Sequence, residues 1–192
     1  MIAILKYNAG NIRSVANALN RLGVESILTD DPDVLNRADK VIFPGVGEAG
    51  SAMTYLQARG LNTVLKQLTQ PVLGICLGLQ LLGRHSEEGD TSGIGIFAER
   101  VRKFPPGAKV PHMGWNNFTT IRGPLFDGIA ADEDLYFVHS YYLETGPDTT
   151  AVTEYQLPFS AAVQKDNFHA VQFHPEKSAA VGQRLLRNFL SL

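Results

Sequence analysis

The sequence lacks the features that mark secreted, membrane-spanning and nucleic-acid-binding proteins. One cysteine, Cys76, stands among 192 residues, so no intrachain disulfide can form and the disulfide-stabilised folds of oxidising compartments are excluded. Lys and Arg number 17 and Asp and Glu 19, a balance that provides no basic surface for nucleic acid or anionic lipid. The apolar run 2–5 is too short for a signal-peptide core, and 71–83 is too short to span a bilayer. We therefore expect a cytoplasmic protein with no nucleic-acid or membrane partner.

The composition is that of one folded domain, and we expect neither a metal nor a cofactor. Hydrophobic residues make up 44% and charged residues 19%, and a chain of this length buries roughly 70% of its unfolded surface without metal or disulfide staples. We expect a single domain over residues 1–192. No zinc-ligand spacing relates Cys76 to the histidines outside the motif described below, which are His85, His112, His139 and His169.

Apolar periodicity predicts an α/β fold. In the first half, strands are expected at 2–5, 24–28, 41–43 and 72–75, and helices at 12–22, from 32, from about 50, at 61–68 and from 77. The second half is richer in strands, which are expected at 101–104, 118–121, 135–142, 151–155, 161–164 and 169–173 before a last helix around 181–189. The polar stretch 86–93 predicts a surface loop. We expect an open, mostly parallel, flavodoxin-like sheet flanked by helices, with an antiparallel extension in the C-terminal half.

The single cysteine lies in a sequence with the spacing of a nucleophile elbow. Gly74-Ile75-Cys76-Leu77-Gly78 places it between a predicted strand and a predicted helix, and flanking glycines permit the sharp turn that presents such a side chain. The N-terminus of the following helix favours a thiolate there, and the N–H of Leu77 is the natural donor to an oxyanion. Cys76 is therefore a candidate nucleophile, and a buried inert thiol is the alternative.

Two further segments supply the groups that such a nucleophile needs. In His174-Pro175-Glu176, the proline favours an extended His174, so that Glu176 can reach the far ring nitrogen and orient the imidazole. In Pro44-Gly45-Val46-Gly47, glycines allow peptide N–H groups of Gly45, Val46 and Gly47 to approach an oxyanion. By themselves, these segments also fit an ordinary surface turn and a plain strand–helix loop.

Taken together, these motifs resemble those of class I (triad-type) glutamine amidotransferases, whose elbow reads G-x-C-x-G-x-Q and whose second motif reads H-P-E. The matching segments here are 74–80 and 174–176, and the resemblance covers almost the whole chain. It implies a Cys76–His174–Glu176 triad that hydrolyses glutamine through a thioester. It also implies that the amino-acid end of the substrate is held by Gln80, Glu88, Ser140 and Tyr141.

Three more segments resemble the glutaminase subunits of imidazole glycerol phosphate synthases. They are Pro111-His112-Met113-Gly114-Trp115-Asn116, the stretch 136–141 and the loop 44–47. The resemblance implies a heterodimer in which ammonia passes to a (βα)8-barrel cyclase subunit that makes imidazole glycerol phosphate and an aminoimidazole carboxamide ribonucleotide in histidine biosynthesis. It places Trp115, Tyr136, Lys177 and Asn11 at the partner interface. We expect little glutaminase activity without the partner.

Three alternatives remain open from the sequence. One is the glutaminase subunit of a pyridoxal phosphate synthase, although that family has Gly-Gly-Glu-Ser where this chain has 44–47. Another is a γ-glutamyl peptidase of the same fold, which needs no ammonia-accepting partner. The third is a regulatory pseudo-glutaminase, which would bind a partner without catalysis.

Overall fold

The computed structural model describes residues 1–107 and 109–192. The helices are α1 (Ile12–Arg21), α2 (Pro32–Arg37), α3 (Ala49–Ala58), α4 (Leu61–Gln67), α5 (Leu77–Leu82) and α6 (Ala179–Leu190), with 3-10 turns η1 (Glu88–Asp90), η2 (Pro124–Phe126) and η3 (Pro175–Lys177). The strands are β1 (Ile2–Leu5), β2 (Ser26–Thr29), β3 (Lys40–Gly45), β4 (Val72–Cys76), β5 (His85–Ser86), β6 (Thr91–Ser92), β7 (Arg100–Lys103), β8 (His112–Asn116), β9 (Thr120–Ile121), β10 (Leu135–His139), β11 (Tyr141–Leu143), β12 (Thr149–Tyr155), β13 (Leu157–Lys165) and β14 (Phe168–Val171).

Most strands join one mixed sheet. Its order is β2-β1-β3-β4-β14-β13-β11-β7-β5-β6, with β12 and β9 continuing from β13. The strands from β2 to β14 are parallel to their neighbours, whereas β13 runs antiparallel to both β14 and β11. The prediction of a parallel sheet with an antiparallel C-terminal extension is confirmed.

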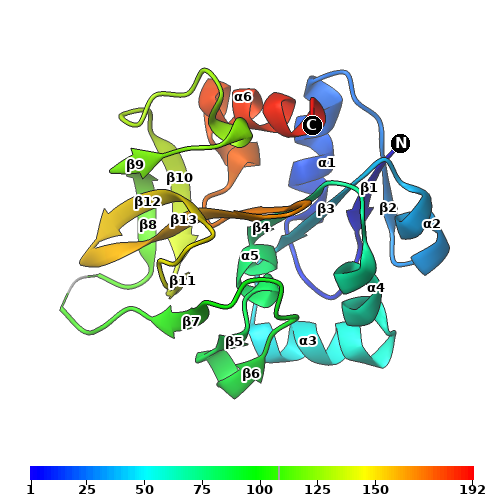
Figure 1. The fold of residues 1–192 in the computed structure, drawn as a ribbon, viewed down its shortest axis with the longest axis horizontal. Helices are drawn as coiled ribbons and strands as arrows, with labels where there is room; N and C mark the ends of the chain where they lie inside the picture. The colour runs from blue at the N-terminus through cyan, green and yellow to red at the C-terminus, as the bar shows by residue number, and fades with distance from the viewer. Residues whose placement is uncertain (108) are drawn as a thin grey trace.

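Helices cover both faces of the parallel part (Figure 1). Alternate residues of β1 face opposite sides: Ile2 and Ile4 join one apolar core with α1 and α6, and Ala3 and Leu5 join another with α3, α4 and α5. A strand buried on both faces reads as a continuous apolar run, which is why the sequence indicates these strands clearly. Asp31 caps α2, since its Oδ1 accepts the Asp33 N–H at 2.8 Å.

Three details of the prediction are wrong. The expected strand 135–142 breaks at Ser140, because β10 pairs with β8 in a separate two-stranded sheet while β11 pairs with β7 and β13. Strand β8, which the sequence does not indicate, exists through this pairing and not through an apolar alternation of its own. The expected loop 86–93 contains the short antiparallel pair β5–β6 around η1.

The parallel topology gathers three strand ends at one edge. Gly45, the last residue of β3, is the register partner of Cys76, the last residue of β4. On the other side of β4, β14 pairs Val171 with Ile75 and then leads into His174. Ligands of open α/β sheets bind at this carboxyl edge, so the fold brings together motifs that lie far apart in the sequence.

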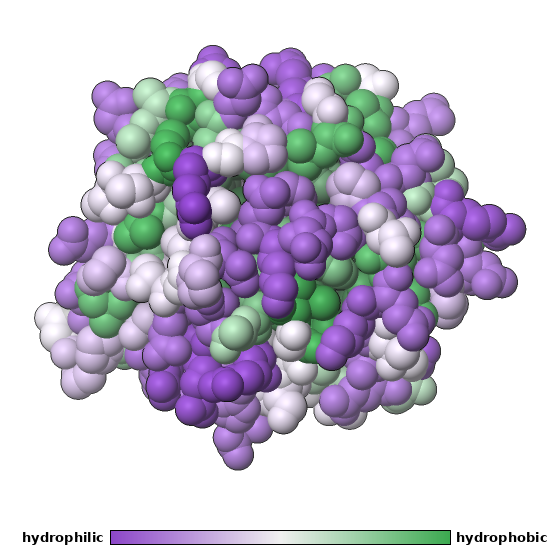
Figure 2. Space-filling view, viewed as in Figure 1, coloured by the Kyte–Doolittle hydropathy of each residue, from purple (hydrophilic) through white to green (hydrophobic). Residues whose placement is uncertain are grey.

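The surface seen from the side of Figure 1 is mostly hydrophilic, with apolar side chains in small separate groups (Figure 2). Within the part of the chain that the structure describes, no helix combines the length and the apolar character that crossing a membrane requires.

Candidate active site

The turn at Cys76 is strained and depends on its neighbouring glycines. Cys76 has φ 54° and ψ −105°, a conformation that costs a non-glycine residue free energy and persists where function requires it. A Cβ on Gly78 would lie 1.8 Å from the Phe43 carbonyl oxygen, and one on Gly74 would lie 3.0 Å from the Ala170 Cβ. The elbow therefore packs directly against β3 and β14, and only glycine fits at position 78.

His174 and Glu176 form a fully buried pair. His174 is extended, with φ −104° and ψ 94°, and the η3 turn that follows brings Glu176 Oε1 to 2.7 Å from His174 Nδ1. Neither side chain is exposed. Since the carboxylate can only accept, Nδ1 carries a proton. The chain reaches this contact through a 3-10 turn, whereas the sequence predicts a continued extended segment.

The Cys76 sulfur and the Glu176 carboxylate together favour a charged His174. Burial alone would lower the ring's pKa, but the hydrogen bonds and negative charges of these two groups outweigh it and raise the pKa of His174 to about 10. His174 Nε2 is buried and makes no hydrogen bond of normal geometry to a described residue. It is therefore the ring nitrogen that can exchange a proton with the Cys76 sulfur. The arrangement is suited to a thiolate–imidazolium pair.

Asn11 lies against this pair. Its amide nitrogen donates a hydrogen bond to Glu176 Oε1 and lies 3.3 Å from His174 Nδ1. Asn11 precedes α1 with φ 71°, a left-handed conformation that asparagine tolerates better than most residues. The sequence assigns Asn11 to the partner interface; the structure places its side chain on the triad, and the interface role stays a prediction.

The loop 45–47 at the end of β3 is held by the segment that contains Tyr7 and Gly10. A Cβ on Gly45 would lie 2.0 Å from the Tyr7 hydroxyl oxygen, and Gly47 has φ 128°, so both positions require glycine. The Val46 carbonyl accepts the Gly10 N–H at 3.2 Å. Because the C=O and N–H of a trans peptide point in opposite directions, the Gly47 N–H points away from Gly10.

A cavity of about 280 Å³ opens beside Cys76. It brings together most of the predicted oxyanion and substrate residues, but Gly45 is not among the residues that line it. The lining residues are Val46, Gly47, Cys76, Leu77, Gln80, Glu88, Pro111, Val138, His139, Ser140 and Tyr141.

Two of the predicted substrate residues are already engaged with the protein. Gln80 is 5% exposed, and its amide nitrogen donates to the Tyr141 carbonyl at 2.9 Å and to Gln172 Oε1 at 3.1 Å. Glu88 Oε2 accepts the Ala49 N–H at 2.9 Å. Partial burial raises the pKa of Glu88 and outweighs this hydrogen bond. Within the Gln80 side chain, both amide hydrogens are used by these contacts, so only its amide oxygen is left to meet a ligand.

The comparisons with known proteins agree with this geometry. A sequence model of the family "Glutamine amidotransferase class-I" matches residues 4–192. The chain belongs to this family. It is 56% identical over 194 residues to "Imidazole glycerol phosphate synthase subunit HisH" of Bacteroides fragilis (strain YCH46), with 100% of this chain and 99% of the relative covered. It is 49% identical to the subunit HisH of Escherichia coli (strain K12), with 100% and 99% covered.

Solved structures show the same fold at low sequence identity. A crystal structure of a glutamine amidotransferase aligns with a TM-score of 0.77 at 19% identity, over 99% of this chain and 97% of that one. A putative GMP synthase subunit from Thermoplasma acidophilum aligns with a TM-score of 0.75 at 20% identity, over 100% and 92%. The predicted resemblance to class I amidotransferases is confirmed.

Gln172 is a residue of this amidotransferase site that the motifs do not indicate. It is fully buried, and its amide nitrogen lies 3.6 Å from the Cys76 sulfur. One signal could have found it: Gln172 stands two residues before His174, and alternate residues of an extended chain share a face.

Two of the predicted interface residues, Trp115 and Tyr136, lie outside the cavity on the β8–β10 sheet, and a third, Lys177, lies beside them on η3. Trp115 is 55% exposed and Met113 59%. Tyr136 is the register partner of Trp115, with ring centroids 5.9 Å apart, and Lys177 Nζ lies 5.9 Å from the Tyr136 ring centroid. We call these four residues the β8–β10 surface. Their role in binding a partner stays a prediction.

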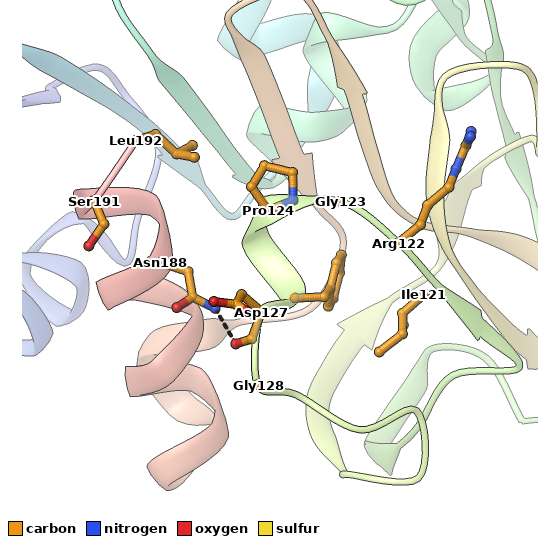
Figure 3. A pocket seen from close by; sticks show the side chains of 10 residues that line it. Ile121, Arg122, Gly123, Pro124, Asp127, Gly128, Asn188, Ser191 and Leu192 are labelled. Carbon is orange, nitrogen blue, oxygen red and sulfur yellow. Dashed lines mark hydrogen bonds between the residues drawn. The ribbon is translucent and has the colours of Figure 1, made fainter.

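A larger hollow of about 650 Å³ lies between β9, η2 and α6 (Figure 3). None of its lining residues also lines the Cys76 cavity. Asn188 donates to the Asp127 carbonyl at 2.8 Å there, and the Arg122 guanidinium donates to backbone carbonyls at Pro147 and Thr149. The side-chain amide of Asn188 and the guanidinium of Arg122 are therefore already paired within the protein.

Proposed function

We propose that this chain is the glutaminase subunit of an imidazole glycerol phosphate synthase. In this role it hydrolyses glutamine to glutamate and ammonia and delivers the ammonia to a cyclase subunit. The observation that carries the proposal is the strained Cys76 elbow at the strand edge that also bears the buried His174–Glu176 pair. The full-length similarity to HisH subunits supports the same role.

The chemistry runs through a thioester. The Cys76 thiolate attacks the side-chain carboxamide carbon of glutamine, and the resulting oxyanion accepts hydrogen bonds from the N–H of Leu77 and from one N–H of the loop 45–47. As the carbon–nitrogen bond breaks, His174 Nε2 gives its proton to the leaving nitrogen, which departs as ammonia. His174 then takes a proton from water, the water oxygen attacks the thioester carbonyl, and the carbon–sulfur bond breaks to release glutamate and the thiolate.

The substrate would occupy the cavity beside Cys76. Glu88 and the backbone around Ser140 and Tyr141 line this cavity, where they can meet the α-amino and α-carboxyl groups. A carboxylate suits the ammonium group of an amino acid. The Gln80 side chain would act chiefly by holding the Tyr141 carbonyl.

The partner would be a (βα)8-barrel cyclase subunit bound at the β8–β10 surface, with which the chain forms a heterodimer in the cytoplasm. Trp115 is exposed and its ring packs against that of Tyr136, and tryptophan and tyrosine are typical anchors of protein interfaces. The HisH relatives favour this partner over that of a pyridoxal phosphate synthase, and the 44–47 loop agrees with that choice.

The test is glutaminase activity of the chain alone, with the cyclase subunit, and with the cyclase subunit loaded with its nucleotide ligand. We expect low activity alone and a large rise in the loaded complex, which Cys76→Ala abolishes. High activity without any partner would favour a γ-glutamyl peptidase. An inactive loaded complex whose Cys76 resists a glutamine-analogue electrophile would favour a pseudo-glutaminase.

A further inference from the structure

We propose that Gln172 is a positioning residue that donates a hydrogen bond to the Cys76 sulfur and thereby stabilises and aims the thiolate. The proposal rests on the proposed glutaminase chemistry. Gln172 does not line the substrate cavity, so it acts through Cys76 and not on glutamine.

The backbone of Gln172 is fixed. It follows β14, and its N–H donates to the Ala161 carbonyl of β13 at 2.8 Å. The side chain is fully buried, and its amide nitrogen lies 3.6 Å from the Cys76 sulfur, a normal distance for an N–H donor to sulfur. A buried amide without a partner is costly, so this contact is the one that satisfies it.

The orientation of the Gln172 amide follows from its neighbour. The Tyr141 carbonyl can only accept, so the Gln80 nitrogen must face it, at 2.9 Å. The same nitrogen reaches Gln172 Oε1 at 3.1 Å, and an amide nitrogen has two hydrogens to give. Gln172 Oε1 is thus the accepting end, which turns the Gln172 nitrogen toward the sulfur.

The Tyr141 carbonyl that anchors this arrangement is itself held by a buried histidine pair. His139 Nδ1 lies 2.8 Å from it and must donate. His139 Nε2 then accepts from His112 Nδ1 at 3.0 Å, and His112 Nε2 accepts from the Asn116 amide at 3.3 Å. With both histidines neutral, every donor and acceptor in this series of hydrogen bonds is assigned. A single ordered path therefore runs from Asn116 to the Cys76 sulfur.

The physical consequence concerns the charged nucleophile. A hydrogen bond to an ionised acceptor is roughly twice as strong as one between neutral groups, so Gln172 stabilises the thiolate more than the thiol. It also restrains the side-chain rotation of Cys76, and a positioned nucleophile reacts faster than a free one.

The test uses the fact that Cys76 is the only cysteine, so alkylation of the full chain by iodoacetamide reports on it alone. The variant is Gln172→Met, which keeps the length and removes the donor. We expect an alkylation rate at pH 7 that is about tenfold lower, and a pH–rate midpoint about one unit higher. Gln164→Met, on the neighbouring strand β13, is the matched control and should behave as the unmodified chain does.

A folded Gln172→Met variant with the normal rate and midpoint would overturn the proposal. Gln172→Glu provides a second reading, because a carboxylate facing the sulfur should move the midpoint further upward than Met does. If Gln172→Met does not fold, as judged by thermal unfolding, Gln80→Met takes its place: it frees the Gln172 amide and should shift the midpoint in the same direction, and no shift would refute the proposal. Alkylation needs neither glutamine nor a cyclase, so this result is independent of whether the proposed function holds.

Discussion

Replacing Glu176 by Gln measures how strongly glutaminase activity depends on the buried charge behind His174. The substitution keeps the shape of the side chain and its accepting oxygen at 2.7 Å from His174 Nδ1, but removes the negative charge. The new NH₂ group would stand where Glu176 Oε2 now lies, buried and without a partner among the described residues. The perturbation is therefore electrostatic, with little steric change.

The magnitude follows from the burial of the pair. Because neither side chain is exposed, solvent does not screen the interaction, and a hydrogen bond to a charged group contributes about 1.5–3 kcal/mol. At 1.36 kcal/mol for each factor of ten in rate, we expect kcat/KM to fall roughly 10- to 150-fold. Loss of the carboxylate should also lower the pKa of His174, which the Glu176 charge helps to raise.

The assay is glutamine hydrolysis in the complex with a loaded cyclase subunit, measured across the pH range. Glu154→Gln, at an exposed position of β12, serves as the control and should leave activity unchanged. If Glu176→Gln stays within twofold of the unmodified enzyme at every pH, the reasoning that makes Glu176 part of the triad is refuted.

Three further predictions concern stability. Burial lowers the pKa of His112 to about 4 and of His139 to about 3, so the unfolded chain binds protons below about pH 6.5 that the folded chain does not; Tm should fall between pH 7 and pH 5, and an unchanged Tm would contradict this. His174 acts in the opposite window: its raised pKa contributes stability below about pH 6.5 that is lost as pH rises toward 10, so chemical denaturation should show a decline there that His174→Gln reduces. The Tyr7 hydroxyl is buried without a hydrogen-bond partner among the described residues, so Tyr7→Phe should raise the free energy of unfolding by about 1 kcal/mol; a destabilised variant would reveal a partner for this hydroxyl.

The sequence predicts the parallel half of the fold well because its signals there are local. A central strand such as β4 is buried on both faces and is apolar throughout, and glycine at position 78 is demanded by the backbone of β3. Both facts leave a mark in the residues themselves. The same holds for Cys76, which ends β4, and for His174, which follows shortly after β14, because the positions of both strands in the sheet follow from topology.

The sequence does not predict an element whose structure depends on pairing with another segment of the same chain. Strand β8 contains Gly114 and the exposed residues Met113 and Trp115, so nothing in its own composition separates it from a loop. Strand β8 forms because it pairs with β10, and this pairing places β10 in a different sheet from β11. The contact of Asn11 with the triad and that of Gln172 with the sulfur are missed for the same reason: an amide side chain acquires such a role only from the groups that the fold brings within hydrogen-bonding distance.

The separate β8–β10 sheet has a consequence for how a partner could act on the nucleophile. Tyr136, on the β8–β10 surface, accepts the His174 N–H through its carbonyl at 2.9 Å. Two residues further along β10, the Val138 carbonyl lies 3.9 Å from the Cys76 sulfur. One short strand thus contacts both the residue that acts as the base and the nucleophile. Among the described strands, β10 is paired only with β8. A protein bound to Trp115 and Tyr136 could therefore shift β10, and with it the contacts to Cys76 and His174, without moving the main sheet.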